Sequence, residues 1–91
     1  MSIRVELFGI ARRRAGVDHV WLNVNSAGSS LGELLGELAR RFPSFAEACL
    51  DGERLRRGFV ANQNGDRFVS DPSTKLQDGD TLLIMSADAG G

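Results

Sequence analysis

The chain has 91 residues, 42% hydrophobic and 25% charged, with a formal net charge of −1 at pH 7. These values are typical of one small globular domain and exclude the disordered, collagen-like and disulfide-scaffold classes. The single cysteine, Cys49, excludes an internal disulfide and a cysteine-based metal cluster. No apolar run approaches the roughly 20 residues of a membrane-spanning helix, and the N-terminus lacks a signal-peptide pattern, so we expect a cytoplasmic protein.

The N-terminal region predicts two strands joined by a short connection. Residues 3–8 and 19–24 alternate between apolar and polar side chains, the period of a half-buried strand. Residues 11–16 predict a turn or helical loop closed by Gly16, so the two strands form a hairpin with a wide connection. Together with the last strand of the chain, the alternation assigns eight residues to one covered face: Ile3, Val5, Leu7, Val20, Leu22, Val24, Leu82 and Ile84.

Residues 29–42 predict the main helix, because their apolar residues fall on one helical face. Ser30 followed by Glu33 is a capping box at its start, and Pro43 ends it. Residues 44–50 predict a short second helix with Ser44 as its cap.

The C-terminal half predicts three strands. Residues 59–63 and 66–69 form a hairpin around Asn64-Gly65, a strong hairpin signal because both residues tolerate positive φ. Residues 70–80 read as a loop with two turns, and residues 81–85 as the last strand. The whole is an α+β domain over residues 1–85, with one main helix packed across a mixed sheet of four to five strands.

One helix covers only one face of a sheet, and the other face is expected to be polar. The alternation instead places Phe8, Trp21, Leu83 and Met85 on it. A contiguous cluster of exposed apolar side chains is typical of an interface. The competing interpretation is that a short helix or loop covers this face, or that the last strand is buried on both sides.

Residues 86–91, SADAGG, are expected to form a flexible tail. Its two terminal glycines lack side chains, so a narrow channel in another protein can close around their backbone and reach the terminal carboxylate. Joined to AMP, that carboxylate becomes a mixed anhydride. A sulfur nucleophile that displaces AMP leaves a thiocarboxylate, whereas a lysine amine would take the acyl group itself. Such a carrier needs no catalytic side chain of its own.

Four segments resemble the ubiquitin-like sulfur carriers, the family that includes the small subunit of molybdopterin synthase (MoaD) and the thiazole carrier ThiS. They are VELFGIARRRAG (5–16), LGELLGELARRFPSF (31–45), DGERLRRGFVANQNGDRF (51–68) and LQDGDTLLIMSADAGG (76–91). The last is the most specific, with DGD, one strand and a short tail ending in Gly-Gly. The resemblance implies the β-grasp, or ubiquitin-like, fold.

The resemblance also implies roles for individual residues. Gly91, preceded by Gly90, would be adenylated and thiocarboxylated. Phe8, Arg12, Met85 and the tail residue Ala89 would contact partners, beside Trp21 and Leu83 from the alternation. It implies no metal and no bound cofactor; ATP is used by the partner that activates the tail.

The expected partners are an E1-like adenylyltransferase and a molybdopterin synthase large subunit or another sulfur-accepting enzyme. The expected function is therefore that of a non-catalytic small subunit in molybdopterin synthesis. The tail lacks the prolines and the apolar residue of many relatives, and the long 50–58 segment also fits carriers for other pathways, such as thiamine, cysteine or tRNA thiolation.

Three other classes remain as alternatives. A ubiquitin-like protein modifier would use the same tail. A nucleic-acid binder would rest on Arg12–Arg14 and Arg54–Arg57, but the net charge of −1 favours solvated arginines or an acidic protein partner. An enzyme is least expected, because His19 reads as a surface residue, Cys49 as a core residue, and Asp78 and Asp80 as turn residues.

Overall fold

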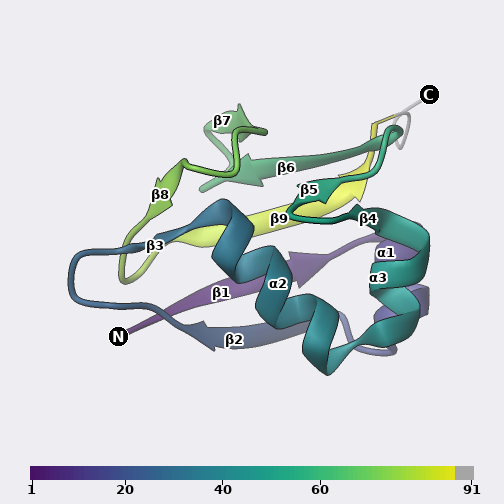
Figure 1. Ribbon diagram of the computed structural model, residues 1–91, viewed down its shortest axis with the longest axis horizontal. Helices are drawn as coiled ribbons and strands as arrows, with labels where there is room; N and C mark the ends of the chain where they lie inside the picture. Colours follow the sequence, from purple (N-terminus) through teal and green to yellow (C-terminus); the bar gives the residue numbers. More distant parts are fainter. Residues whose placement is uncertain (88–91) are drawn as a thin grey trace.

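The computed structural model describes residues 1–87, which form a five-stranded sheet with helices packed against it (Figure 1). In spatial order, the sheet contains β2 (His19–Asn23), β1 (Ser2–Leu7), β9 (Thr81–Ser86), β6 (Phe59–Gln63) and β7 (Arg67–Val69). β1 and β9 are parallel, and the other neighbouring pairs are antiparallel. The mixed sheet is as predicted, and each strand boundary lies within one residue of its expected position.

The alternation of β1 and β9 fixes the covered face of the sheet. Ile3, Val5 and Leu7 of β1 and Leu82 and Ile84 of β9 are almost completely buried. Of the eight residues assigned to this face from the sequence, only Val20 remains partly exposed.

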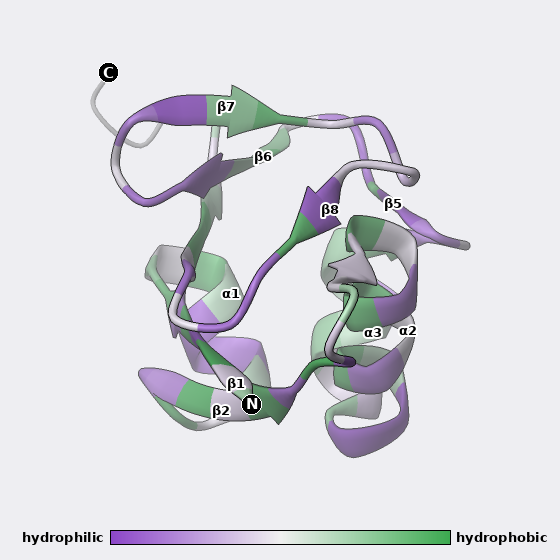
Figure 2. Cartoon of the chain, turned by 90° about the vertical axis from the view of Figure 1, so that its left-hand side faces the viewer, coloured by the Kyte–Doolittle hydropathy of each residue, from purple (hydrophilic) through white to green (hydrophobic). Residues whose placement is uncertain are grey.

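Helix α2 (Leu31–Arg41) packs across this face. The predicted capping box is confirmed, because Ser30 Oγ accepts a hydrogen bond from the backbone N–H of Glu33 at 3.1 Å and Glu33 Oε1 accepts one from Ser30 N–H at 2.8 Å. The leucines of α2 enter the core, and Figure 2 shows the sheet on one side of the molecule with α2 and α3 on the other.

Two shorter helices, α1 and α3, lie at the end of the molecule where β9 ends (Figure 1). α1 (Gly9–Ala15) ends at Gly16, whose φ of 79° requires a residue that tolerates the left-handed conformation. α3 (Pro43–Cys49) begins at Pro43 with Phe42 in the capping position, so the prediction of Ser44 as cap is wrong. Proline suits the first helical position because its φ is fixed and its missing N–H would have no helical partner there.

Two small antiparallel pairs lie outside the main sheet, and the sequence did not predict them. β3 (Ser29–Ser30) pairs with β8 (Lys75–Leu76), and β4 (Leu50–Asp51) pairs with β5 (Arg54–Leu55). The expected loop over residues 70–80 therefore contains a strand. Two-residue strands are too short to show an alternation, although Leu76 is fully buried and fastens this segment to the core.

The Asp80 carboxylate ties the turn before β9 to the β6–β7 hairpin. It accepts hydrogen bonds from the backbone N–H of Gln77 at 2.8 Å, from Gln63 Nε2 at 2.9 Å and from Asn64 Nδ2 at 3.0 Å. Burial raises the pKa of Asp80, but these hydrogen bonds outweigh burial and leave the pKa below its ordinary value. This confirms the interpretation of Asp80 as a structural turn residue.

We expect Asp80→Asn to lower the free energy of unfolding by about 1 kcal/mol at neutral pH, the net worth of a hydrogen bond. Because the folded pKa is depressed, the wild type keeps this contribution above the unfolded pKa of about 3.9 and loses it as pH falls through the folded value. Urea unfolding at several pH values measures both effects. Asp66→Asn, in the exposed hairpin turn, is the matched control; equal stability of the two variants would contradict the prediction.

Candidate docking face and tail exit

Phe8 and Met85 lie side by side because β1 and β9 run parallel. Leu7 pairs with Ile84, and the backbone N–H of Phe8 donates to the Ile84 carbonyl at 3.0 Å. Both residues therefore sit at the end of the sheet where β9 leads into the tail. The Phe8 side chain is 42% exposed and that of Met85 is half-buried.

The apolar surface continues from Met85 onto β6 and β7. Val60 pairs with Met85, Asn62 with Leu83, and Phe68 with Asn62, so these side chains share the face opposite α2. Phe68 is 68% exposed. The open apolar patch, as defined here, consists of Phe8, Val60, Phe68, Leu83 and Met85.

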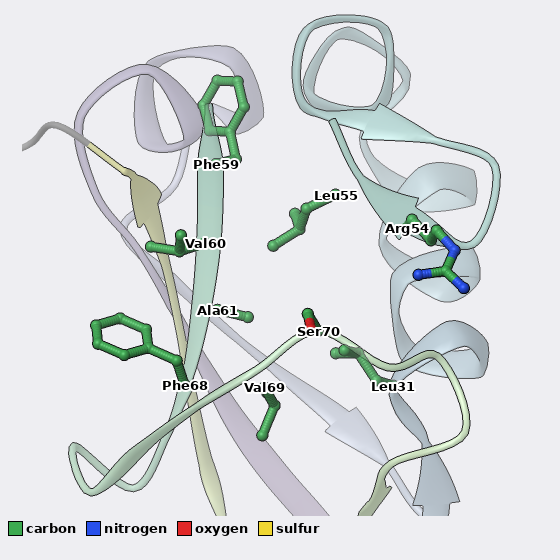
Figure 3. A pocket seen from close by; sticks show the side chains of 9 residues that line it. All are labelled: Leu31, Arg54, Leu55, Phe59, Val60, Ala61, Phe68, Val69 and Ser70. Carbon is green, nitrogen blue, oxygen red and sulfur yellow. The ribbon is translucent and has the colours of Figure 1, made fainter. Parts of the chain in front are cut away.

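Figure 3 shows the two sides of β6 and β7 directly. Val60 and Phe68 point away from α2, whereas Ala61 points toward the helix side and Leu55, on β5, points toward β6. A cavity of about 200 Å³ lies on the covered side, with Leu31, Leu55 and Ala61 among its lining residues. Val60 and Phe68 of the open apolar patch also line this cavity, so the patch and the cavity adjoin at β6 and β7.

Trp21 lies on the same face but apart from the patch. β1 runs between β2 and β9, and its residues Arg4 and Glu6 separate Trp21 from Leu83. Arg4 Cζ lies 5.8 Å from the centre of the Trp21 ring, and Arg4 Nε donates to Glu6 Oε2 at 3.0 Å. The structure brings Phe8, Leu83 and Met85 together as expected, whereas charged side chains separate Trp21, 54% exposed, from them.

Three residues of this face were missed from the sequence: Val60, Asn62 and Phe68. The alternation in residues 59–63, followed through the Asn64-Gly65 turn to Phe68, was the signal that could have found them. Asn62 is unusual because its Oδ1 atom is buried and has no hydrogen-bond partner within residues 1–87. The face therefore carries a desolvated polar atom next to Leu83.

The tail begins at the same end of the sheet. The backbone N–H of Ala87 donates to the Gly58 carbonyl at 2.7 Å, which fixes where the chain leaves the body. Arg12 is exposed on α1, near Asp18. Ala89, Gly90 and Gly91, the tail residues with predicted roles, lie outside the described residues, as does most of the expected flexible segment.

The two side chains that the sequence offered as catalytic groups, Cys49 and His19, are not in an active-site arrangement within residues 1–87. Burial raises the pKa of the Cys49 thiol, and the charges of the nearby Arg14 and Arg56 only partly offset this rise. Because the thiolate is the reactive form, the thiol is a poor nucleophile. His19 is an exposed residue, and its Nδ1 lies 2.7 Å from Asp18 Oδ1. Within residues 1–87, no group of three or more His, Cys, Asp or Glu side chains is placed to hold a metal ion. No helix in the described part of the chain is long and apolar enough to cross a membrane.

The sequence model of the ThiS family matches residues 5–91, which include the open apolar patch and the terminal glycines. The chain belongs to the ThiS family. Its members are small ubiquitin-like sulfur carriers and modifiers, which confirms the family expected from the sequence. No curated protein sequence matches the chain significantly.

Solved structures confirm the β-grasp fold. This ThiS-family chain is similar to the putative molybdopterin converting factor subunit 1 of Pyrococcus furiosus, with 25% identity over 94% of this chain and 97% of that chain and a TM-score of 0.76. It is similar to a chain of the Amycolatopsis orientalis BexX/CysO complex, with 25% identity over 98% and 99% of the two chains and a TM-score of 0.73. SAMP1 of Haloferax volcanii shares the fold at 22% identity over the full length of both chains, with a TM-score of 0.80.

We expect Asn62→Val to raise the free energy of unfolding, because it removes a buried carbonyl oxygen without a partner, whose desolvation costs about 1–3 kcal/mol. Valine also suits a strand position between Leu83 and Phe68. Urea unfolding measures the change. Asn23→Val, at an exposed position of β2, controls for the β propensity of valine, and a larger gain at Asn23 than at Asn62 would contradict the prediction.

Proposed function

We propose that this chain is a sulfur carrier whose Gly91 carboxylate is adenylated by an E1-like enzyme and then converted to a thiocarboxylate that donates sulfur. The observation that carries the proposal is the ThiS-family match, which runs to Gly91. The position of Ala87 supports it, because the tail leaves the body beside Phe8 and Met85. A partner that binds the open apolar patch would have the terminus within reach.

The chemistry requires only the terminal carboxylate from this chain. A Gly91 carboxylate oxygen attacks the α-phosphorus of ATP, and pyrophosphate leaves. Hydrosulfide supplied by the activating system then attacks the carbonyl carbon, so that a C–S bond forms, the C–O bond to AMP breaks and the sulfur loses its proton. The resulting thiocarboxylate is a protein-bound nucleophile for the acceptor enzyme. The buried Cys49 takes no part in these steps.

The number of residues after Ser86 agrees with a carrier in which the folded body binds the partner and the tail carries the reactive group. Residues 87–91, when extended, span roughly 15–18 Å, enough to reach an active site well inside a partner. The open apolar patch supplies the area on which the partner docks, as exposed apolar clusters do in protein interfaces. The body therefore provides affinity, and the tail provides the reactive group.

For the acceptor, we favour a molybdopterin synthase large subunit. The similarity to a putative molybdopterin converting factor subunit at 25% identity supports this choice, and a Helicobacter pylori structure holds subunits 1 and 2 of that factor in one complex. The equal identity to a chain of the BexX/CysO complex favours a second candidate, a carrier for another sulfur pathway. A ubiquitin-like modifier would use the same activated terminus, with a lysine amine as the acceptor.

The intact mass of the protein isolated from its own cells is expected to include a species in which one oxygen of the Gly91 carboxylate is replaced by sulfur. Fragmentation of the C-terminal peptide locates the exchange. Alkylation of fresh lysate traps the thiocarboxylate before it hydrolyses. Finding only Gly-Gly remnants on lysines of other proteins, with no sulfur-containing terminus after trapping, would contradict the carrier role and favour the modifier.

Deletion of Gly91 is expected to abolish ATP-dependent activation, because the new carboxylate ends one residue short of the adenylation site. Pyrophosphate release with the E1-like enzyme of the same organism measures activation, and thermal unfolding checks that the body is intact. Gly36→Ala is the control, since apart from the adjacent backbone of its own helix nothing lies within 4 Å of an added Cβ there. Normal activation of the deletion variant would reject the proposed function.

A further inference from the structure

Two arginine clusters that are far apart in the sequence meet at one end of the molecule. Arg14 Nη1 on α1 donates to Ser44 Oγ on α3 at 3.3 Å. Arg56 is held at the other end of α3, where its backbone N–H donates to the Cys49 carbonyl at 2.7 Å and its Nη2 to the Leu50 carbonyl at 3.1 Å. Both arginines are thus positioned by the segment that forms α3 and β4.

This basic surface borders the tail exit. Arg57 follows Arg56 and precedes Gly58, whose carbonyl binds the backbone N–H of Ala87. α1 contacts both α3 and β9. Figure 1 shows α1, α3, β4 and the end of β9 gathered at the same end of the molecule. The tail-exit arginines, as defined here, are Arg14, Arg56 and Arg57.

The tail-exit arginines are free to pair with an acidic partner, as far as residues 1–87 show. All three residues are exposed. Within residues 1–87, the ion pairs join Arg4 to Glu6, His19 to Asp18, and both Arg40 and Arg41 to Glu37, so none involves these three arginines. Arg54, their neighbour in the sequence, lies instead toward Asp71, whose pKa is lowered chiefly by hydrogen bonds from Ser73 and to a lesser extent by the charge of Arg54.

We propose that the tail-exit arginines form a basic docking surface for a cluster of carboxylates at the mouth of the channel through which the activating enzyme receives the tail. Guanidinium groups pair with carboxylates through charge-assisted, often bidentate hydrogen bonds. The surface is continuous with the end of the sheet that carries Phe8 and Met85, so one partner covers both. This inference rests on the proposed function and names the kind of surface that the partner presents.

The charge of the whole chain favours an acidic protein over a nucleic acid. The formal net charge is −1, so no field of the whole molecule draws it to a polyanion. The positive charge is concentrated where the tail leaves, which is the place where a tail-binding partner must approach. Charges at the rim of an interface mainly increase the association rate and the selectivity.

The test is the dissociation constant between the full-length protein and the E1-like enzyme of its own organism. Arg57→Glu is the first variant, because Arg57 has no side-chain hydrogen bond within residues 1–87. Arg14→Glu/Arg57→Glu is the second. We expect weaker binding by about tenfold for the single variant and more for the double variant at about 50 mM salt, with a smaller loss at about 300 mM. Most of the loss is expected in the association rate.

Lys75→Glu is the matched control, because it makes the same charge change at an exposed position on β8, at the opposite end of the molecule. The inference is overturned if Arg57→Glu and the double variant bind the enzyme as tightly as Lys75→Glu does. It is also overturned if the affinity of the wild type does not depend on salt. Tighter binding of the wild type to single-stranded RNA, used as a polyanion probe, than to the enzyme would also overturn it. Absence of Gly91-dependent pyrophosphate release by the wild type would instead reject the proposed function, and this inference with it.

Discussion

The parallel pairing of β1 with β9 is the constraint on which the rest of the structure depends. It joins the N-terminal hairpin to the C-terminal strands in one sheet, with β1 and β9 at its centre. Parallel neighbours cannot be connected by a tight turn, so the chain between them must cross over the sheet, and α2 lies in that crossover. The same pairing sets Phe8 beside Met85 and releases the tail at their end of the sheet.

The two faces of the sheet differ in character: one forms the core, and the other carries the candidate binding surface. The covered face buries Ile3, Val5, Leu82 and Ile84 against the leucines of α2. The open face leaves Phe68 exposed and holds the Asn62 carbonyl oxygen without a partner within the described residues. Features that cost stability in an isolated domain are typical of a surface that a partner covers. The buried position of Cys49 agrees with the proposed function, in which the reactive group is the terminal carboxylate and not a thiol.

The sequence predicted the elements that have a clear period. The alternation of residues 3–8 and the helical spacing of residues 29–42 gave β1 and α2 nearly to the residue, and the capping box at Ser30 located the helix start. The β3–β8 and β4–β5 pairs were missed because two residues cannot show a period. Proline at the first position of α3 displaced the expected cap at Ser44, since Pro43 already has the φ that a helix start requires.

The candidate site was predicted less completely, because alternation gives the face of a residue but not its neighbours. Trp21 and Leu83 share a face, yet β1 inserts Arg4 and Glu6 between them. Val60 and Phe68 join Met85 and Leu83 only through the register of β6 with β9 and β7. The strand order, which is a property of the whole chain, therefore decides which apolar residues form one patch.

Under the proposed function, proteins that share this fold and end in the same pair of glycines would present the same reactive group to an activating enzyme. The terminal carboxylate alone therefore cannot select the partner, and selection must come from the body. An apolar patch gives binding energy but discriminates poorly, because apolar side chains tolerate many shapes of contact. Fixed charges discriminate well, since a like charge or an unpaired buried charge on a wrong partner costs several kcal/mol. The hydrogen bonds that hold Arg14 to Ser44 and Arg56 to Leu50 set such charges at the end of the molecule where Ala87 leaves the sheet, which is the end that the proposed partner would approach.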